Sequence, residues 1–348
     1  MSDLYPKGIR DLTFRVEMLD GFVSKGELLT ESFSISMDYT AEIKFSASLT
    51  VADNPNMDWQ KNRIKITMID NGEDYVLGTF LPQYVSRQFT NGKELLNVEA
   101  YDLSILVQMD CITQRLNIAQ GEKYLNVIQN LLVSSGIQNV NAVDSNATFL
   151  TARDDWDIGT SKIKIVNQLL QEIGYSEITT DAYGTVILAP YEEPTPENIK
   201  QQYDDTTASV LLPEISSTNN AYEIPNIFIG IVSNPDIDEP ITYQYINDNP
   251  ANPTSTIYTG SNKVMVLEVD NIASQEDLET YVRKIAYENM QGEETVEIQT
   301  AISQHGVRDI IALSTTNISG IFSEISWQID SESFVMNHTL KRTVVLWE

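Results

Sequence analysis

The chain has 348 residues, with 22 Lys or Arg against 50 Asp or Glu, so its formal net charge is −28. This charge argues against binding nucleic acid through phosphate neutralisation. Apolar residues make up 42% of the chain and charged residues 21%, as in ordinary globular proteins, so the acidity does not indicate a disordered polyacid. The length predicts two or three domains, and the single Cys111 forms no disulfide within the chain.

Residues 1–112 are predicted to form an N-terminal β-barrel domain. Apolar and polar residues alternate over 33–39, 43–49 and 63–68, which is the period of half-buried strands. Asn-Gly at 91–92 predicts a tight turn between two further strands. Five or six strands at short spacing, without a long helical pattern among them, favour a small antiparallel barrel or sandwich.

Residues 113–200 are predicted to form a small α/β domain with two helices and a hairpin. Apolar residues recur at helical spacing over 123–135 and 161–173, and a glycine follows each run where a helix cap is expected. The sequence at 181–184 predicts the turn of the hairpin. A stretch rich in Pro and Glu follows, which favours a linker and a domain boundary near residue 200.

Residues 201–348 are predicted to form a C-terminal β-barrel-like domain with one packed helix, at 274–291, and one long loop, at 234–256. The helix begins with Ser274 and acidic residues in its first turn, and the loop is rich in Pro, Asn and Asp. This segment carries a charge of −16, against −7 and −5 for the two preceding segments. An uneven charge of this kind suits either a highly soluble surface or a wall that repels polyanions.

No catalytic, cofactor or metal site is predicted. The two histidines, His305 and His338, are 33 residues apart, and neither has a second His or Cys at the spacing of a zinc site. Acidic clusters at 154–157 and 236–239 lack the central Gly and terminal Glu of an EF-hand loop and are interpreted as solvated loops. Among the acids, no carboxylate pair stands in an apolar setting that would raise one pKa for glycoside chemistry.

The sequence contains no signal-peptide core in residues 1–10 and no run of 18 apolar residues, so we expect synthesis in the cytoplasm without membrane insertion. The four Trp and 16 Tyr allow an aromatic surface that binds sugar or protein. Most of them lie in apolar alternation, which favours packing in a core.

A series of short motifs resembles the tail hub, or baseplate hub, proteins of phages and prophages. In the middle segment, Trp precedes Gly-Thr, a helix with Asn-x-Leu-Leu, Gly-Tyr, an Asp-x-x-Gly hairpin and Pro-Tyr. Near the end, His305 is followed by Gly-x-x-x-x-x-x-Trp at 320–327 and by His338, although Gly306 stands where the family has Pro. The residues that carry the resemblance are Trp156, Gly159, Thr160, Leu169, Gly174, Tyr175, Gly184, Tyr191, Gly320, Trp327 and His338.

The resemblance implies a mainly β chain with α+β parts: two tail-tube-like antiparallel β-barrel domains joined by a small α/β domain. It implies a structural homotrimer without a cofactor, whose six barrels join a sixfold tail tube or distal tail proteins to a threefold tip, spike or fibre. Such a protein is made in the bacterial cytoplasm and assembled into the tail of a virion or of a tail-like bacteriocin particle. DNA would pass through its lumen without stable binding, which gives the acidity a use.

Two other functions remain open from the residues. A non-enzymatic module that binds carbohydrate at the host surface would use the long loop at 234–256, since loops on a β scaffold often carry recognition. A peptidoglycan hydrolase is the less favoured alternative, because the sequence singles out no catalytic group.

Overall fold

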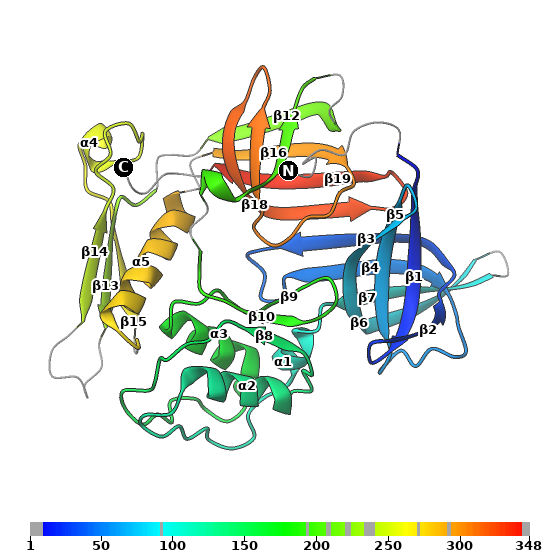
Figure 1. Cartoon of the computed structure of the whole chain (residues 1–348), viewed down its shortest axis with the longest axis horizontal. Helices are drawn as coiled ribbons and strands as arrows, with labels where there is room; N and C mark the ends of the chain where they lie inside the picture. The colour runs from blue at the N-terminus through cyan, green and yellow to red at the C-terminus, as the bar shows by residue number, and fades with distance from the viewer. Residues whose placement is uncertain are drawn as a thin grey trace.

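The computed structural model describes residues 10–90, 93–192, 195–206, 210–219, 224–232, 241–269, 272–290 and 294–342. The fold is mainly β, in one large sheet and two small sheets, with five α-helices among the described residues (Figure 1). Within these ranges, no helix has both the length and the apolar character that crossing a bilayer requires.

The N-terminal barrel is closed where the chain bends at Leu28. Leu28, between β2 and β3, donates its N–H to the carbonyl of Val16 in β1, so that β2 and β3 together pair with β1 at one end and β4 at the other. Its core contains Ile35, Leu49 and Ile66, each at most 3% exposed. The strands of the barrel are β1 (Leu12–Asp20), β2 (Val23–Glu27), β3 (Thr30–Asp38), β4 (Phe45–Ala52), β5 (Arg63–Asp70), β6 (Glu73–Thr90) and β7 (Lys93–Tyr101).

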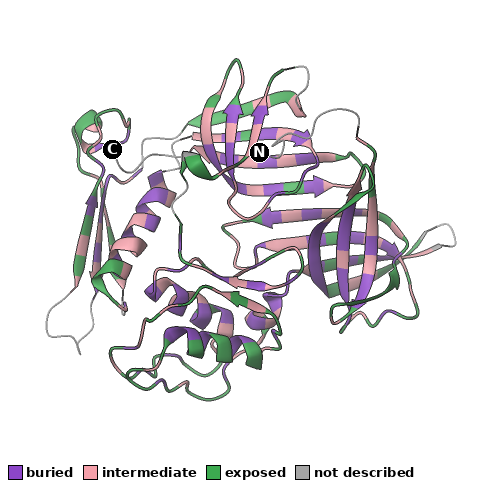
Figure 2. Cartoon of the chain, viewed as in Figure 1, coloured by how far each residue is buried: buried purple, intermediate pink, exposed green. Residues whose placement is uncertain are grey.

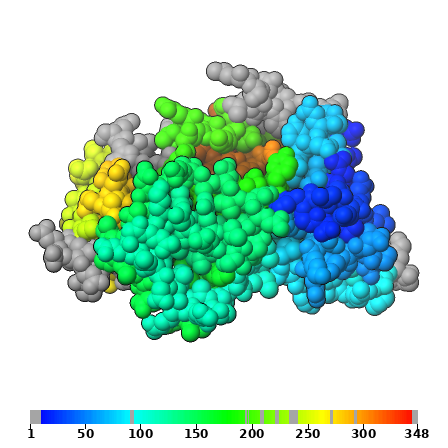
Figure 3. Space-filling view, turned by 60° about the horizontal axis from the view of Figure 1, so that its bottom comes forward, coloured from blue at the N-terminus to red at the C-terminus, as the bar shows by residue number. Residues whose placement is uncertain are grey.

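An α/β region with its own hydrophobic core follows the barrel. Its two main helices lie within one residue of the predicted ranges and pack against each other, and Figure 3 shows the region between the N-terminal barrel and α5. The elements are α1 (Ile105–Met109), α2 (Tyr124–Ser134), β8 (Val140–Ala142), α3 (Lys162–Glu172), β9 (Thr179–Thr180) and β10 (Val186–Leu188), followed by a 3-10 turn at Pro196–Asn198.

A second curved sheet surrounds another core near the C-terminus. Tyr203, Ile311, Phe322 and Leu340 are buried together inside it. Its strands are β11 (Ile199–Asp204), β12 (Leu211–Asn219), β16 (Glu294–Ala301), β17 (Ile310–Ser314), β18 (Ser319–Asp330) and β19 (Val335–Arg342).

The segment between β12 and β16 differs from the prediction. We predicted one long loop at 234–256, but the structure has β14 (Thr242–Ile246) within it, and residues 233–240 lie outside the described part. The predicted helix is α5 (Gln275–Met290), yet it packs mainly on a small sheet of β13 (Ile227–Val232), β14 and β15 (Val264–Val269) rather than on the barrel. Alternating apolar residues signal each strand but not which layer it joins. A short helix, α4 (Thr256–Thr259), follows β14.

One strand joins the two barrels into a single sheet. The first part of β18 pairs with β17, and Ser326–Asp330 pairs antiparallel with Ser34–Asp38 of β3. The resulting run of eight strands has the order β12, β16, β19, β18, β3, β4, β7 and β6 (Figure 1). One face of this run is buried against the two barrel cores (Figure 2).

Candidate functional site

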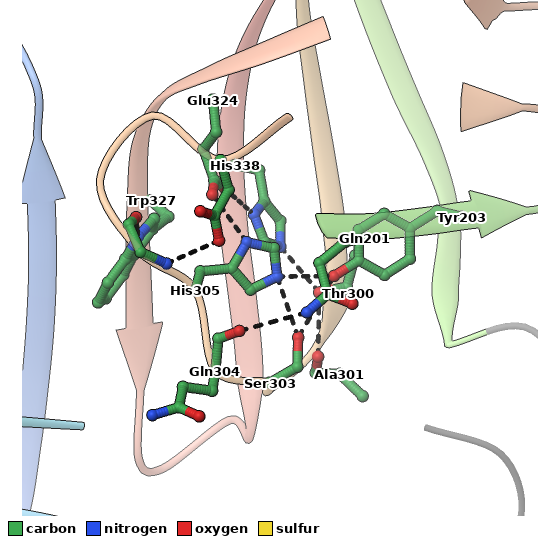
Figure 4. Close-up of polar contacts among 12 residues, drawn as sticks. Gln201, Tyr203, Thr300, Ala301, Ser303, Gln304, His305, Glu324, Trp327 and His338 are labelled. Atoms are coloured by element: carbon green, nitrogen blue, oxygen red, sulfur yellow. Dashed lines mark hydrogen bonds and ion pairs between the residues drawn. The ribbon is translucent and has the colours of Figure 1, made fainter. Parts of the chain in front are cut away.

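A buried cluster of His305, Glu324 and His338 lies where β18 leaves the C-terminal sheet for β3. The register of β18 against β19 shifts between Glu324 and Ser326, and the backbone N–H of Glu324 donates to the carbonyl of Asp309. The Glu324 side chain therefore lies inside the core, between one histidine on β19 and one on the loop after β16 (Figure 4).

Glu324 binds one histidine with each carboxylate oxygen. His305 Nδ1 lies 2.7 Å from Oε2, and His338 Nδ1 lies 2.5 Å from Oε1. The other ring nitrogens are also partnered: His305 Nε2 lies 2.8 Å from the Tyr203 hydroxyl, and His338 Nε2 lies 2.8 Å from Thr300 Oγ1. Every polar atom of the three side chains thus has a hydrogen-bond partner, as buried polar groups require.

The cluster shifts the pKa values of its two histidines in opposite directions. Burial opposes ionisation of Glu324, but the two histidines lower its pKa below the usual value. Burial likewise opposes protonation of His305, but the charge of Glu324 raises the pKa of that imidazole. Burial lowers the pKa of His338, and the positive charge of protonated His305 lowers it further. The folded core therefore favours the ionised carboxylate and favours protonation of His305 over protonation of His338.

Two imidazoles and one carboxylate are ligands that zinc accepts, and their ligand atoms lie within 4.8 Å of one another. Two ligands of one tetrahedral zinc ion at about 2.0–2.1 Å stand about 3.3 Å apart. The 2.7 and 2.5 Å separations from Nδ1 to the carboxylate are those of charge-assisted hydrogen bonds instead. The arrangement fits a proton-holding network and does not fit a shared ion.

Arg308 forms a second buried junction, where all the parts of the chain meet. It donates from Nη1 to the Tyr39 hydroxyl and from Nη2 to the Tyr191 hydroxyl, both at 3.2 Å. Its guanidinium also lies 5.5 Å from the ring centre of Tyr287 and 3.8 Å from Glu288. Tyr39 follows β3, Tyr191 follows β10, and the last two residues belong to α5, so one side chain contacts three bodies besides its own.

Lys44 links the N-terminal barrel to the α/β region. Only 3% of its side chain is exposed, and its ammonium donates to the carbonyls of Tyr39 and Ala41 and to Glu177 at 2.7 Å. A cavity of about 530 Å³ lies nearby, between β6, the β9–β10 hairpin and the loop that contains His305. Arg308 and Lys44 thus both connect the N-terminal barrel to the α/β region.

The motif residues of the middle segment make hydrogen bonds or pack within the α/β region. The Trp156 indole donates to Gln168, Leu169 is fully buried, and Gly159 has a φ of +93°. The Thr160 hydroxyl donates to the carbonyl of Asp157, and the Tyr175 hydroxyl donates to that of Val143.

Two glycines of the motif allow close packing between bodies. Gly184 has a φ of +82°, and a Cβ there would lie 2.8 Å from Leu103. Gly174 has a φ of +68°, and its α-carbon faces Thr280 of α5. A side chain at Gly184 would come too close to Leu103, and one at Gly174 would crowd Thr280, so glycine allows the close approach at both positions.

The motif residues near the C-terminus lie on β18 and β19. Gly320 has a φ of +148°, with Arg342 over it, and the Trp327 indole donates to the carbonyl of Gly306 at 3.1 Å. Of all the motif residues, His338 belongs to the buried cluster and Tyr191 to the Arg308 junction. The structure thus brings two of the eleven motif residues into the polar sites.

Sequence reasoning missed Arg308, Lys44 and Glu324, and with them the meeting of the two histidines. The spacing of the two histidines along the chain does not predict this contact, because His305 lies on the loop after β16 and His338 on β19, and folding alone brings their rings to 4.9 Å. One available signal was the scarcity of histidine, since both copies lie within the last 44 residues. The acidic cluster at 236–239 lies outside the described residues.

The structure, unlike the sequence, resembles proteins of known structure. The sequence matches no protein-family model and no curated protein. A tail protein from Neisseria meningitidis MC58 has a TM-score of 0.67 at 12% identity, over 94% of this chain and 96% of that chain. The 43 kDa tail protein of prophage MuSo2 from Shewanella oneidensis has a TM-score of 0.65 at 9% identity, over 95% and 98%.

The fold is that of phage and prophage tail proteins.

The tail-protein fold extends to a secretion component. The E. coli c3393 protein, of the type VI secretion system, has a TM-score of 0.53 at 10% identity, over 97% of this chain and 78% of that chain. That protein is itself described as similar to the T4 bacteriophage tail proteins gp27 and gp5. The resemblance found in the motifs and the predicted fold class are therefore confirmed as a tail-protein fold, mainly β and largely antiparallel.

Proposed function

We propose that the chain is a structural, non-enzymatic tail hub that forms a homotrimer between a sixfold tail tube and a threefold tip, spike or fibre. The observation that carries this proposal is the eight-stranded run with an open edge at each end. Among the described strands, Ile215–Asn219 of β12 pairs with β16 alone, and Tyr84–Thr90 of β6 pairs with β7 alone.

The direction of the strands allows these edges to join between copies. Each neighbouring pair in the run is antiparallel, so the two outer strands of an even-numbered run point in opposite directions. The β6 edge of one copy can then continue the β12 edge of the next with the same antiparallel pairing. Closure of this kind removes exposed edges, which otherwise promote aggregation. Three copies would supply six barrels, which matches a tube of sixfold symmetry.

The free face of the run suits a channel for a polyanion. Its side chains are mainly small hydroxyls and amides, and a hollow of about 330 Å³ lies over part of it. Hydroxyls and amides neither bind phosphate by charge nor offer an apolar surface to bases, and Lys341 is the one cation among these residues. The residues include Ser32, Ser34, Ser36, Ser46, Ser48, Thr50, Tyr84, Ser86, Asn97, Glu99, Ser326, Gln328, Asp330, Asn337, Thr339, Lys341, Glu297 and Gln299.

Cross-linking between the open edges tests the trimer. In a Cys111→Ser background, Thr218→Cys on β12 and Gln88→Cys on β6 would be treated with a short thiol-reactive cross-linker. We expect covalent products that stop at three chains, and native mass measurement of the unmodified protein should give the same number. A control pair at Thr50 and Gln299, on inner strands, should give no linked trimer. A ladder that runs beyond three chains, or a strict monomer at high concentration, would contradict the proposal.

The aromatic surface that a carbohydrate-binding module would need receives no support from the tryptophans. Trp156 and Trp327 are buried, and Trp59 is partly buried against the N-terminal core. Trp347 lies outside the described residues.

A further inference from the structure

The eight-stranded run consists of two halves that share one pattern. β12, β16, β19 and β18 form the first half, and β3, β4, β7 and β6 form the second half, in this order across the sheet (Figure 1). In each half the pairing of the first strand with the second shifts register once, and so does the pairing of the last strand with the third. The two halves can therefore be compared residue by residue.

The register shifts align the two halves. One residue is skipped in each last strand, and pairing resumes at Ser326 in β18 and at Tyr84 in β6. The row of paired residues that starts at Ser326 ends at Ser216 in β12. The row that starts at Tyr84 ends at Ser34 in β3, so Ser216 corresponds to Ser34. The full rows are Ser326, Thr339, Glu297 and Ser216 in one half and Tyr84, Glu99, Ser48 and Ser34 in the other.

The junction between the halves supplies a template for a junction between copies. Within the chain, the last strand of one half, β18, pairs with the first strand of the other, β3, so that Asp330 faces Ser34. β6 and β12 hold the same two positions in their halves, but each has an edge without a described neighbour, which a second copy can supply. In such a pair, Gln88 takes the place of Asp330, and Ser216 takes the place of Ser34.

We propose that β6 of one copy pairs with β12 of a second copy in the register that β18 and β3 adopt within one chain. This interface rests on the proposed homotrimer and adds which residues face each other across copies. Arg87 is the one charged residue among them, so the contact brings no two carboxylates together despite the net charge of −28. The pairs are Val85–Asn219, Ser86–Thr218, Arg87–Ser217, Gln88–Ser216 and Phe89–Ile215.

The apolar residues of the two edges favour the same register independently. Phe89 is 74% exposed, although it shares a face of β6 with Val85, which packs on the N-terminal core. Ile215 packs on the C-terminal core and is only partly buried. In the proposed register these two apolar residues face each other. A shift by two residues would set Phe89 against Ser217 or Pro213, and a shift by one would set a polar face against an apolar face.

The backbone of the inner junction identifies positions where a disulfide could join the copies. Ser331 donates its N–H to the carbonyl of Phe33 at 3.0 Å, so these residues form a hydrogen-bonded pair. Such pairs alternate with non-hydrogen-bonded pairs, whose Cα atoms lie about 4.5 Å apart, and the next pair is Asp330 with Ser34. A Cα separation of this size permits a disulfide. The corresponding pairs between copies are Gln88–Ser216 and Ser86–Thr218.

Disulfide formation tests the register in the full chain with Cys111→Ser. Two double variants, Gln88→Cys/Ser216→Cys and Ser86→Cys/Thr218→Cys, place cysteines of neighbouring copies directly opposite each other. Two control variants combine the same four substitutions the other way, as Gln88→Cys/Thr218→Cys and Ser86→Cys/Ser216→Cys. Their cysteines are diagonal neighbours with Cα atoms about 7–8 Å apart, which is too far for a direct disulfide. Covalent trimer is measured after mild oxidation, and native mass is measured on the reduced proteins.

We expect the facing pairs to give at least about tenfold more covalent trimer than the diagonal pairs. Equal yields, or a higher yield from the diagonal pairs, would overturn the register and leave the proposed hub standing. The same holds if no variant forms a disulfide while the native mass is that of three chains. A strict monomer by native mass would overturn both.

A second measurement examines the contact of Phe89 with Ile215. Phe89→Ser should weaken association of the trimer about two- to fivefold per interface, because an aromatic side chain facing a β-branched one stabilises a strand pair. Ile158→Ser is the matched control, because Ile158 is 64% exposed in the α/β region, and it should leave association unchanged. An equal effect of both substitutions would overturn this contact.

Discussion

The buried cluster should give the protein a stability maximum near neutral pH, with two limbs that belong to different histidines. The folded pKa of His305 is raised, so its contribution is fully present below the unfolded value of about 6.5 and is lost as pH rises through the folded pKa. The folded pKa of His338 is lowered, so its contribution is present above about 6.5 and is lost as pH falls. Stability from this cluster therefore declines on both sides of about pH 6.5.

The lowered pKa of Glu324 places a second loss at lower pH. Its contribution is present above the unfolded value of 4.5 and disappears as pH falls through the folded pKa. Replacing Glu324 by Gln removes one buried charge and leaves His305 without its partner. Breaking a buried ion pair in this way costs about 3–5 kcal/mol. At about 2 °C per kcal/mol for a large domain, the midpoint of thermal unfolding should fall by about 6–10 °C.

The assay combines thermal unfolding from pH 4 to 9 with NMR of the two imidazoles. Because the chain has two histidines, a single variant assigns both signals. His305→Gln should flatten the alkaline limb, and His338→Gln should flatten the acid limb. Glu332→Gln, at an exposed turn, is the matched control and should leave the profile unchanged. Two imidazoles that titrate together near pH 6.5 in the folded protein would refute the reasoning.

Three further predictions concern the Arg308 junction, the contact of Gly184 with Leu103 and the buried cluster around Glu324. Arg308→Met removes the donor shared by the Tyr39 and Tyr191 hydroxyls and should lower the free energy of unfolding by about 1–3 kcal/mol in urea titration, whereas the exposed control Arg115→Met should change it by less than about 0.5 kcal/mol. Gly184→Ala forces a Cβ to within 2.8 Å of Leu103 at a φ of +82°, so it should cost about 1–3 kcal/mol, while Gly121→Ala, with the same φ sign and open space, should cost less. EDTA should leave the unfolding midpoint unchanged, since the spacing around Glu324 is that of hydrogen bonds; a fall of several degrees with chelator would show a bound ion.

Local patterns were sufficient to predict the helices and most strands. α2, α3 and α5 begin and end within one or two residues of the ranges expected from apolar spacing and terminal glycines. These signals act over three or four residues, so they are visible in a single segment. The same locality explains why α5 was assigned to the wrong layer, since its apolar stripe specifies a buried face but not the sheet that covers it.

Contacts between distant segments were not predictable in this way. The pairing of β3 with β18 joins residues almost 300 positions apart, and nothing in either strand distinguishes it from an ordinary half-buried strand. Arg308 reads in the sequence as one more surface base, although it lies between Tyr39 and Tyr191. Such sites depend on which bodies meet, and that is decided by the packing of the whole chain.

The position of the buried cluster has a mechanical reason. β18 serves two barrels, and a strand that changes partners must bend, which the register shift after Glu324 permits. A bulge that nothing braced would let the barrels pivot about the β3 junction. The eight-stranded run would then lose the common curvature that the proposed closure into a ring needs. By binding one histidine on each side, Glu324 holds the bend from within, while Arg308 and Lys44 hold it from the α/β side. If this is correct, Glu324→Gln should lower the yield of cross-linked trimer at a temperature where the single chain remains folded.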